Sequence, residues 1–331
     1  MTKVTSEQET TTRDRTRAEQ ALLAGLVEYG LFVPSEVPGI YGRGVVYEAV
    51  LAGFNHFLSQ QTREDGACCL HFPPIMPRAN LERIGYLESF PHLAGLVFSF
   101  EGGDVDHLEL LSQLQNGESY AGAVKMTDVV LNSATCQPLY PTLRGKRLPD
   151  GGSLFDLVAY CFRREPSHDP IRMQSFRMRE HVCLGHPADV RRWRERWLVR
   201  AREMFQRIGL KVDEVVANDP FFGRGGRMLA TEQRASEAKF EFVLPISSTE
   251  APTAIMSFNY HEDHFTGPYD IRTSDGARAH SACLGIGIER IAIALFKTHG
   301  FDPETWPASV RAHLGLSGKP RPEGTPGGDA A

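Results

Sequence analysis

Apolar residues recur every three or four positions in four segments of the chain, which is the spacing of helices that pack one face against a core. These segments are residues 18–29, 47–60, 108–114 and 190–208. The apolar run at 154–162 indicates a helix that passes into a strand. Shorter runs rich in β-branched and aromatic residues predict strands. They lie at residues 212–216, 240–245 and 254–260.

The predicted helix at 47–60 leads through the run ACCLHF into Pro73 and Pro74. A strand that ends there is expected, because proline cannot continue the interior of a sheet. The later strands follow one another across turns without a regular alternation with helices, which favours antiparallel pairing. The pattern therefore predicts an α+β fold with a mostly antiparallel sheet flanked by helices.

The composition narrows the class of protein. A chain of 331 residues with 41% hydrophobic residues is long enough to bury a large core. Residues 1–17 are polar and residues 315–331 are rich in glycine and proline, so we expect two disordered tails around one domain at 18–314. No apolar run approaches the roughly 20 residues that span a bilayer, and the first residues lack the apolar stretch of a signal peptide. A cytoplasmic protein is expected.

The charge and the cysteines exclude further classes. The formal net charge of −5 supplies no overall basic field that would draw the protein onto nucleic acid, although a local basic patch is compatible with it. Six cysteines are too few for a disulfide framework at this length. A cysteine with a special role is therefore expected to be a metal ligand or a nucleophile.

Charged residues flank a short turn in the sequence FRREPSHDPIRMQSF, which spans residues 162–176. The planar guanidinium of Arg163 suits phosphate oxygens, the carboxylate of Glu165 can accept the amino group of adenine, and Phe176 can stack on a base. The segment therefore fits a nucleotide. Taken alone, such a segment is more often a solvated hairpin whose charges pair with each other.

A second segment, CLGIGIER at residues 283–290, runs directly into the apolar helix IAIALF. Its glycines allow a ligand to approach the backbone closely, and Arg290 at the start of the helix can hold phosphate. A lone GxG is most often only a tight turn. The segment is not the dinucleotide-binding fingerprint, because the third glycine is missing.

In this order the two segments resemble motifs 2 and 3 of class II aminoacyl-tRNA synthetases, and Pro74 after its helix and strand resembles motif 1, the dimer-interface element of that family. The similarity to seryl-tRNA synthetases extends over roughly residues 40–300. It implies a class II catalytic core that forms a homodimer and uses ATP with Mg²⁺. By this resemblance Arg163 contacts the α-phosphate, Glu165 the adenine amino group, Phe176 the adenine ring and Arg290 the γ-phosphate side. Other positions that it places at the ATP or substrate site are Arg172, Met173, Lys239, Ala254 and Ser257.

Two cysteines replace polar substrate contacts of the ordinary seryl enzymes. Cys136 stands where their TxE loop has a glutamate, and Cys283 stands where an asparagine usually precedes motif 3. This exchange resembles the atypical zinc-dependent seryl enzymes and their truncated bacterial relatives, the amino acid:[carrier protein] ligases. The resemblance implies one zinc per chain held by Cys136, Glu180 and Cys283, with one coordination position open for the α-amino group of the substrate. Asn259 joins Cys136 and Glu180 as a candidate contact of the substrate amino acid.

Simpler roles for several of these residues stay open. Cys136 and Cys283 are small buried hydrophobes if the resemblance is left aside, and packing is the role expected of Cys68, Cys69, Cys161 and Cys183. The sequence His261-Glu262-Asp263-His264 has the spacing of a metal pair on a helix, but its surroundings predict a strand entering a polar loop near the site. Because Ala254 replaces an acidic residue of the ordinary seryl enzymes, the usual Mg²⁺ arrangement is in doubt.

An insertion at residues 221–238 carries three arginines around a short helix that we expect to begin near Met228. The arginines are Arg224, Arg227 and Arg234. The resemblance implies that this helix binds an acidic carrier protein, which a basic surface would complement; an ordinary solvated helix is the alternative. Only about 40 residues precede the motif 1 helix, and they contain neither sustained heptads nor a basic arm for tRNA.

The expected function is a ligase that activates a small amino acid with ATP and transfers it to the phosphopantetheine thiol of a carrier protein. Glycine is the favoured substrate and alanine the next. The alternatives are a truncated atypical seryl-tRNA synthetase that charges tRNA and a catalytically silent synthetase paralogue. Neither a membrane nor tRNA is expected as a partner.

Overall fold

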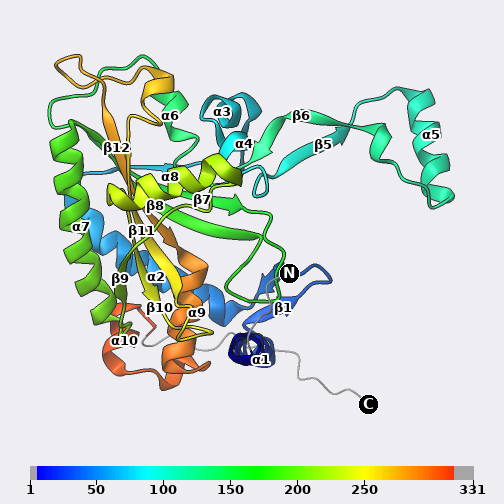
Figure 1. Ribbon diagram of the computed structural model, residues 1–331. Coiled ribbons are helices and arrows are strands. Elements are labelled where there is room, and N and C mark those ends of the chain that lie inside the picture. Colours follow the sequence, from blue (N-terminus) through cyan, green and yellow to red (C-terminus); the bar gives the residue numbers. More distant parts are fainter. Residues whose placement is uncertain (1–5, 317–331) are drawn as a thin grey trace.

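The computed structural model describes residues 6–316, and within them the side chains of all but residues 6–12, 224, 225, 229, 232 and 235. A seven-stranded sheet with helices packed on it forms the body of the molecule (Figure 1). In spatial order its strands are β3 (Cys68–His71), β7 (Ser153–Phe162), β8 (Ser175–Gly185), β12 (His280–Gly287), β11 (Thr253–Glu262), β10 (Lys239–Leu244) and β9 (Asp213–Val216).

The pairing in this sheet confirms the predicted α+β fold. Strands β3 and β7 are parallel, and every other neighbouring pair in the sheet is antiparallel. Helices α7 (Pro187–Arg207) and α9 (Ile288–His299) pack on the sheet, and α2 (Val45–Thr62) packs on α9. The mostly antiparallel sheet flanked by helices is therefore the one expected from the sequence.

The two faces of the sheet have different roles, because side chains alternate along a strand. On β12, Ala282, Leu284 and Ile286 belong to the main hydrophobic core, to which α2, α7 and α9 also contribute. Cys283 lies between them in the sequence and belongs to a second, smaller cluster. The face opposite the main core carries the candidate site.

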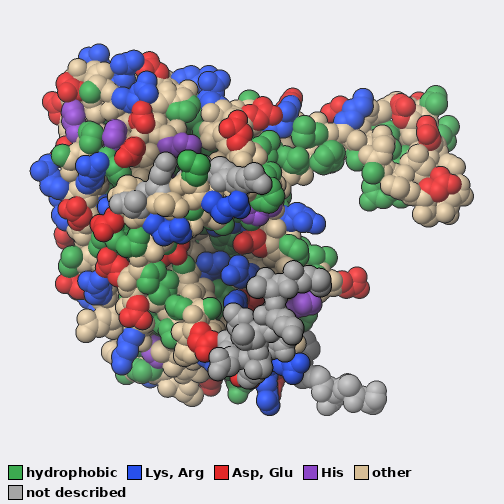
Figure 2. Space-filling view, viewed as in Figure 1, with side chains coloured by type: hydrophobic (Ala, Val, Ile, Leu, Met, Phe, Trp, Pro, Cys, Tyr) green, Lys and Arg blue, Asp and Glu red, His purple; other side chains and the backbone are tan. Residues whose placement is uncertain are grey.

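An arm projects from the body of the molecule (Figures 1 and 2). It is built on a three-stranded sheet of β4 (Ile75–Pro77), β6 (Val124–Leu131) and β5 (Leu96–Phe100), and α5 (Asp104–Gln115) lies at its outer end. No residue of α5 is buried. Phe98 is 55% exposed and Leu108 is 66% exposed, so the arm presents apolar side chains that nothing within the described residues covers.

The remaining elements connect these parts. They are α1 (Ser6–Glu28), β1 (Phe32–Pro34), β2 (Tyr41–Arg43), the 3₁₀ turn Arg63–Asp65, α3 (Arg78–Arg83), α4 (Tyr86–Ser89), the 3₁₀ turn Ala121–Ala123, α6 (Leu139–Thr142), α8 (Gly223–Ala235), the 3₁₀ turns Gly267–Tyr269 and Pro303–Thr305, and α10 (Ala308–His313). No helix within residues 6–316 is long and apolar enough to cross a bilayer.

Most of the predicted elements are present, and three differ. The segment 154–162 is strand throughout, because β7 is paired on both sides and a buried strand carries the same continuous apolar run as a buried helix. Helix α8 begins at Gly223 rather than near Met228. Helix α1 begins at Ser6 rather than Ala18, so part of the segment expected to be a disordered tail is helical; residues 1–5 and 317–331 lie outside the described residues.

The four cysteines assigned to packing divide into two pairs. Cys161 and Cys183 are buried, as expected, but Cys68 and Cys69 are exposed. The prediction for the second pair is wrong because β3 is an edge strand, paired on one side with β7, so its residues lie at the margin of the sheet.

Candidate metal centre and nucleotide site

Three buried side chains that can ligate a metal meet on the face of the sheet opposite the main core. The ligand atoms of Cys136, Glu180 and Cys283 all lie within 4.8 Å of one another. Glu180 comes from β8 and Cys283 from β12, which is the neighbouring strand, and Cys136 lies in the loop between β6 and α6. These are the three residues expected from the sequence to hold a metal.

Burial dominates the electrostatics of this group. It raises the pKa of Glu180 to about 8, and the adjacent Cys283 adds to the effect. A hydrogen bond from the Cys136 thiol, together with the nearby His261, lowers the pKa of the Cys283 thiol. The backbone N–H of Cys136 donates to the Glu180 carboxylate. A carboxyl and two thiols packed this closely away from water form a site in which a bound cation would favour the deprotonated ligands.

The donor set fits a zinc ion. Tetrahedral zinc with sulfur at ~2.3 Å places neighbouring ligand atoms ~3.5–3.8 Å apart, and the Cys283 sulfur lies 3.8 Å from Oε1 of Glu180. Three protein ligands leave a fourth position for a substrate, as catalytic sites do. Glycine is needed at position 285 beside these residues, because a Cβ added there would lie 2.8 Å from the Ser257 hydroxyl and 3.6 Å from Oε1 of Glu180.

The loop between β7 and β8 brings together the residues expected to bind a nucleotide. The guanidinium of Arg163 lies 5.7 Å from the centre of the Phe176 ring, and its Nε donates to the carbonyl of Ser133 at 3.2 Å. Arg172 lies 3.8 Å from the Glu165 carboxylate and is half exposed. Arg163 and Phe176 are therefore close enough to bind one ligand together.

Arg290, at the start of α9, points to the same region. It donates to the carbonyls of Ile171 and Ala254 at 3.3 and 3.0 Å. Burial lowers the pKa of Arg290, and the positive charge of Arg163 lowers it further. Ala254 therefore contributes a carbonyl that is already hydrogen-bonded. Met173 is buried, and its sulfur accepts a hydrogen bond from Arg43.

One charged group beside the site was not expected from the sequence. Arg177 on β8 donates to Glu289 through its backbone N–H and its Nε, both at 2.7 Å, and its two terminal nitrogens donate to Glu48 of α2 at 2.7 and 2.8 Å. These pairs connect β8, α2 and α9 just behind Phe176 and Arg290. Arg177 directly follows Phe176 and Glu289 directly precedes Arg290, so their positions in the sequence indicated that both lie near the site. No pattern in the sequence indicated that Arg177 pairs with Glu48.

Lys239 pairs with carboxylates and forms no hydrogen bond or ion pair with Arg163, Phe176 or Arg290 among the described residues. Its Nζ pairs with Asp219 at 2.5 Å and with Glu241 at 3.2 Å, and the residue is buried. Asp219 in turn bonds Gln233 of α8 twice, at 2.7 and 2.8 Å. Lys239 thus attaches α8 to the sheet, a contact that the sequence did not indicate.

The carrier-binding candidates lie on or beside α8. Arg227 and Arg234 are exposed, and Arg234 donates to the side chain of Asn218. The side chain of Arg224 lies outside the described residues. Pro74, the proposed interface residue, lies between β3 and β4 and accepts the backbone N–H of Asn132 at 3.0 Å.

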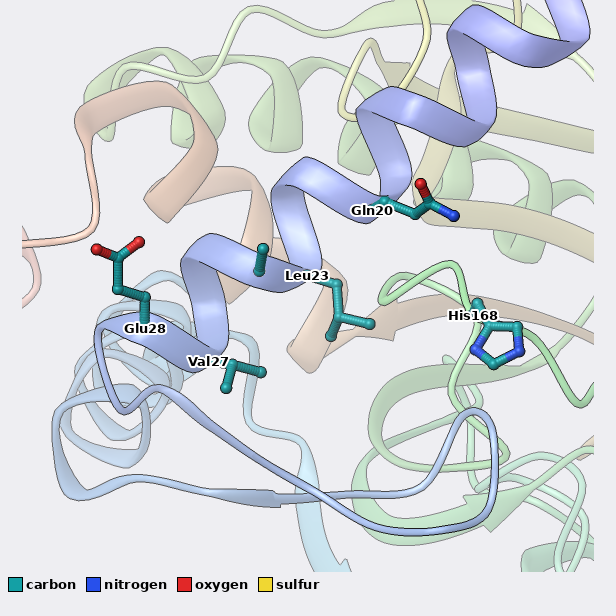
Figure 3. A pocket seen from close by; sticks show the side chains of 6 residues that line it. Gln20, Leu23, Val27, Glu28 and His168 are labelled. Atoms are coloured by element: carbon teal, nitrogen blue, oxygen red, sulfur yellow. The ribbon is translucent and has the colours of Figure 1, made fainter. Parts of the chain in front are cut away.

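A separate apolar groove of about 660 Å³ lies between α1 and the loop that carries His168 (Figure 3). Leu23 and Val27 of α1 line it. None of the residues expected to bind metal, nucleotide or carrier lines this groove, so it does not mark the candidate site.

Comparison with known proteins agrees with this geometry. No protein-family model matches the chain. Amino acid–[acyl-carrier-protein] ligases 1 and 2 of Bradyrhizobium diazoefficiens are each 44% identical to it, over 84% and 87% of this chain and 85% and 86% of their own length. The type-2 serine–tRNA ligase of Methanopyrus kandleri is 30% identical over 76% of this chain and 52% of its own length.

Solved structures give the fold. The seryl-tRNA synthetase of M. kandleri in complex with A. aeolicus tRNASec matches with a TM-score of 0.76 at 22% identity, covering 89% of this chain and 60% of that one. That of Pyrococcus horikoshii complexed with ATP matches with a TM-score of 0.65 at 15% identity, covering 89% and 62%. The protein thus has the catalytic fold of class II aminoacyl-tRNA synthetases. Its identity to the two Bradyrhizobium proteins shows more: the chain belongs to the amino acid–[acyl-carrier-protein] ligase family.

Proposed function

We propose that this protein activates a small amino acid with ATP and transfers it to the phosphopantetheine thiol of a carrier protein. The observation that carries the proposal is the buried group of Cys136, Glu180 and Cys283, next to two segments that carry arginines. Arg163 directly follows β7, and Arg290 lies at the start of α9, directly after β12. A metal-binding group for an amine and a pair of arginines for phosphate are the two parts that amino acid activation needs. The relatives named as carrier-protein ligases support the acceptor.

In the first step the substrate carboxylate attacks the α-phosphorus of ATP. A carbon–oxygen–phosphorus link forms, the bond to the β-phosphate oxygen breaks, and pyrophosphate leaves. Arg163 holds the α-phosphate and Arg290 the far phosphates, while Phe176 and Glu165 fix the adenine. Positioning and charge stabilisation supply most of the catalysis in such transfers. Mg²⁺ accompanies ATP in this proposal. The methyl side chain of Ala254 has no atom that can ligate it.

Zinc bound by Cys136, Glu180 and Cys283 would supply a Lewis acid that takes the α-amino group in its neutral form. The substrate that we propose is glycine, with alanine as the next candidate.

In the second step the thiol sulfur attacks the activated carbonyl and AMP leaves, so the protein is an AMP- and pyrophosphate-forming ligase. Arg227 and Arg234 on or near α8 provide positive charge for an acidic carrier. Arg163, Glu165 and Arg290 are all present, which disfavours a catalytically silent paralogue.

The deciding experiment offers the protein ATP and radiolabelled glycine together with either a holo-carrier protein or tRNA. We expect label on the carrier, and amino-acid-dependent exchange of pyrophosphate into ATP. Label that appears on tRNA and never on the carrier favours the alternative of a tRNA-charging enzyme, which the structural match to a synthetase bound to tRNASec brings into consideration. Absence of exchange with every small amino acid overturns the enzyme proposal.

A further inference from the structure

One face of strand β11 carries polar side chains beside the candidate metal centre. Its even-numbered residues Met256, Phe258 and Tyr260 belong to the main core, whereas Ser257, Asn259 and His261 are half-buried on the other face. Asn259 is the direct partner of Cys283 in the β11–β12 pairing. The register of two strands therefore places β11 side chains against one metal ligand.

Two nitrogens of β11 contact the sulfur of Cys283. Nδ2 of Asn259 donates to it at 3.4 Å, and Nε2 of His261 lies 3.2 Å from it. Among the described residues, no amide or imidazole nitrogen is within hydrogen-bond distance of the Cys136 sulfur, in contrast to that of Cys283. The two thiol ligands thus have unequal surroundings.

The chemistry of the sulfur assigns a donor role to His261. A metal-binding thiolate can only accept hydrogen bonds, so we assign a hydrogen to Nε2 of His261, which makes this nitrogen the donor. Amide and imidazole N–H groups are then both aimed at the same acceptor.

The position of the imidazole is fixed by its neighbours. The pairing of β11 with β12 shifts register between Tyr260 and Glu262, and Glu262 has φ of 51°. The His261 ring packs edge-on against Phe265 at 4.8 Å, and Phe265 stacks on the buried Tyr140 at 4.9 Å. A bulge and an aromatic stack therefore hold the ring over Cys283.

We propose that His261 and Asn259 are positioning residues of the metal centre, which orient the Cys283 thiolate and weaken its electron donation by two N–H···S hydrogen bonds. Neighbours of this kind set ligand orientation and metal properties in other metalloproteins. A less strongly donating sulfur leaves the metal a better acceptor for the substrate amine. The inference rests on the metal site of the proposed function and adds residues to it.

The test uses the full-length protein loaded with Zn²⁺ and, separately, with Co²⁺. Zinc affinity is measured by competition with a chromophoric chelator, and cobalt binding by the sulfur-to-cobalt charge-transfer band. We expect His261→Ala to lower zinc affinity ~10–100-fold and to move the band to longer wavelength, because a sulfur without donors loses an electron more easily. We expect Asn259→Ala to change the zinc affinity and the position of the band in the same directions but by less. His261→Gln keeps an N–H donor, so it should retain most of the wild-type affinity and band position.

His264→Ala is the matched control, because His264 packs on Phe265 from the same loop and has no contact with the sulfur among the described residues. We expect it to leave both readouts unchanged. If His261→Ala and Asn259→Ala keep the wild-type affinity and band, or lose affinity with no movement of the band, the positioning role is wrong while the metal site stands. If the wild-type protein binds neither ion, the metal site of the proposed function fails and the inference fails with it.

Discussion

At the scale of single residues, the candidate nucleotide site has two guanidinium groups in one region. Burial is the main cause that lowers the pKa of Arg290, and the charge of Arg163 lowers it further. Like charges held this close repel one another until an anion binds between them. Neither arginine has a carboxylate partner among the described ion pairs. The arrangement is therefore suited to a polyanion such as the triphosphate of ATP.

We expect Arg290→Ala to lower the rate of glycine-dependent ATP–pyrophosphate exchange ~10²-fold or more, since removal of one preorganised donor to a developing negative charge has an effect of this size. Arg290→Lys keeps the positive charge but loses the planar fork of donors. Its exchange rate should therefore lie between that of the wild type and that of Arg290→Ala. Steady-state exchange at saturating ATP measures the loss. An exchange rate within a factor of two of wild type would remove Arg290 from the site.

Replacement of a metal ligand separates the zinc proposal from the nucleotide proposal. In Cys283→Ser we expect the bound zinc, about one per chain in the wild type, to be lost and exchange activity to fall at least ~100-fold. Metal content by mass spectrometry and exchange activity are measured side by side, with far-ultraviolet circular dichroism as the check of fold. The exposed Cys69→Ser is the matched control. Full exchange activity in metal-free protein would contradict the role given to zinc.

At the scale of residues, the sequence indicated which side chains come together where a motif carried the information, and their roles stay predictions. Cys136, Glu180 and Cys283 come from three segments far apart in the chain, and the structure brings their ligand atoms together. The contact between His261 and Cys283 could not be predicted in the same way. It depends on a register shift in β11 and on cross-strand pairing, and no local pattern in the sequence records either.

At the scale of elements, α8 is attached to the sheet by a small polar cluster. Gln233 of α8 bonds Asp219, and Asp219 pairs with the buried Lys239 of β10. Burial opposes ionisation of Asp219, but the charge of Lys239 and a hydrogen bond from the Gln233 amide outweigh it and lower the pKa of Asp219. The Asp219 carboxylate is thus one of the groups that hold the proposed carrier-binding helix in position, together with the contact between Arg234 and Asn218.

We expect Asp219→Asn to lower the free energy of unfolding by about 1–3 kcal/mol at pH 7 and to speed hydrogen exchange in α8. Because the folded pKa of Asp219 is depressed, its stabilisation is complete above the unfolded value of about 3.9 and is lost as the pH falls through the folded value. The difference between wild type and variant should therefore disappear in acid. Urea unfolding across pH measures it, and a difference that is constant with pH would exclude the carboxylate as its source.

Elements were predicted well where an amphipathic pattern was strong, as for α2 and α7. The arm was recognised only through α5, because β5 and β6 pair mainly with each other in a sheet that the sequence did not suggest. The helical content of residues 6–17 was also missed. That segment has few apolar positions, and local pairs such as Arg15 with Glu19 stabilise it instead.

At the scale of the whole molecule, the outer part of the arm is a two-stranded ribbon of β5 and β6 that leads to α5. A two-stranded hairpin without a covered face is only marginally stable in water. The arm grows from the small sheet that contains β4, directly after Pro74. Because the segment around Pro74 resembles motif 1, we propose the dimer interface there. A second copy of the chain is therefore the partner we propose for the arm.

We expect the protein to be a dimer in light scattering, and Phe98→Ser combined with Leu108→Ser to yield monomer. Val199→Ser, which alters an equally exposed apolar residue on α7, should leave the dimer intact. A wild-type protein that is monomeric at all concentrations contradicts the proposal, and so does a double variant that remains dimeric.

The alternation along β12 has a consequence for how such a protein changes over time. Ala282, Leu284 and Ile286 pack into the main core from one face of the strand, while Cys283 belongs to the candidate metal centre on the other. Loss or gain of one residue in β12 would turn the sulfur into the core and leucine toward the metal. An insertion or deletion that displaced Cys283 from the candidate metal centre would therefore also disrupt the hydrophobic core and destabilise the fold. Inherited variation is expected to gather in the arm and the α8 insertion, where acceptors and partners can change while activation is kept.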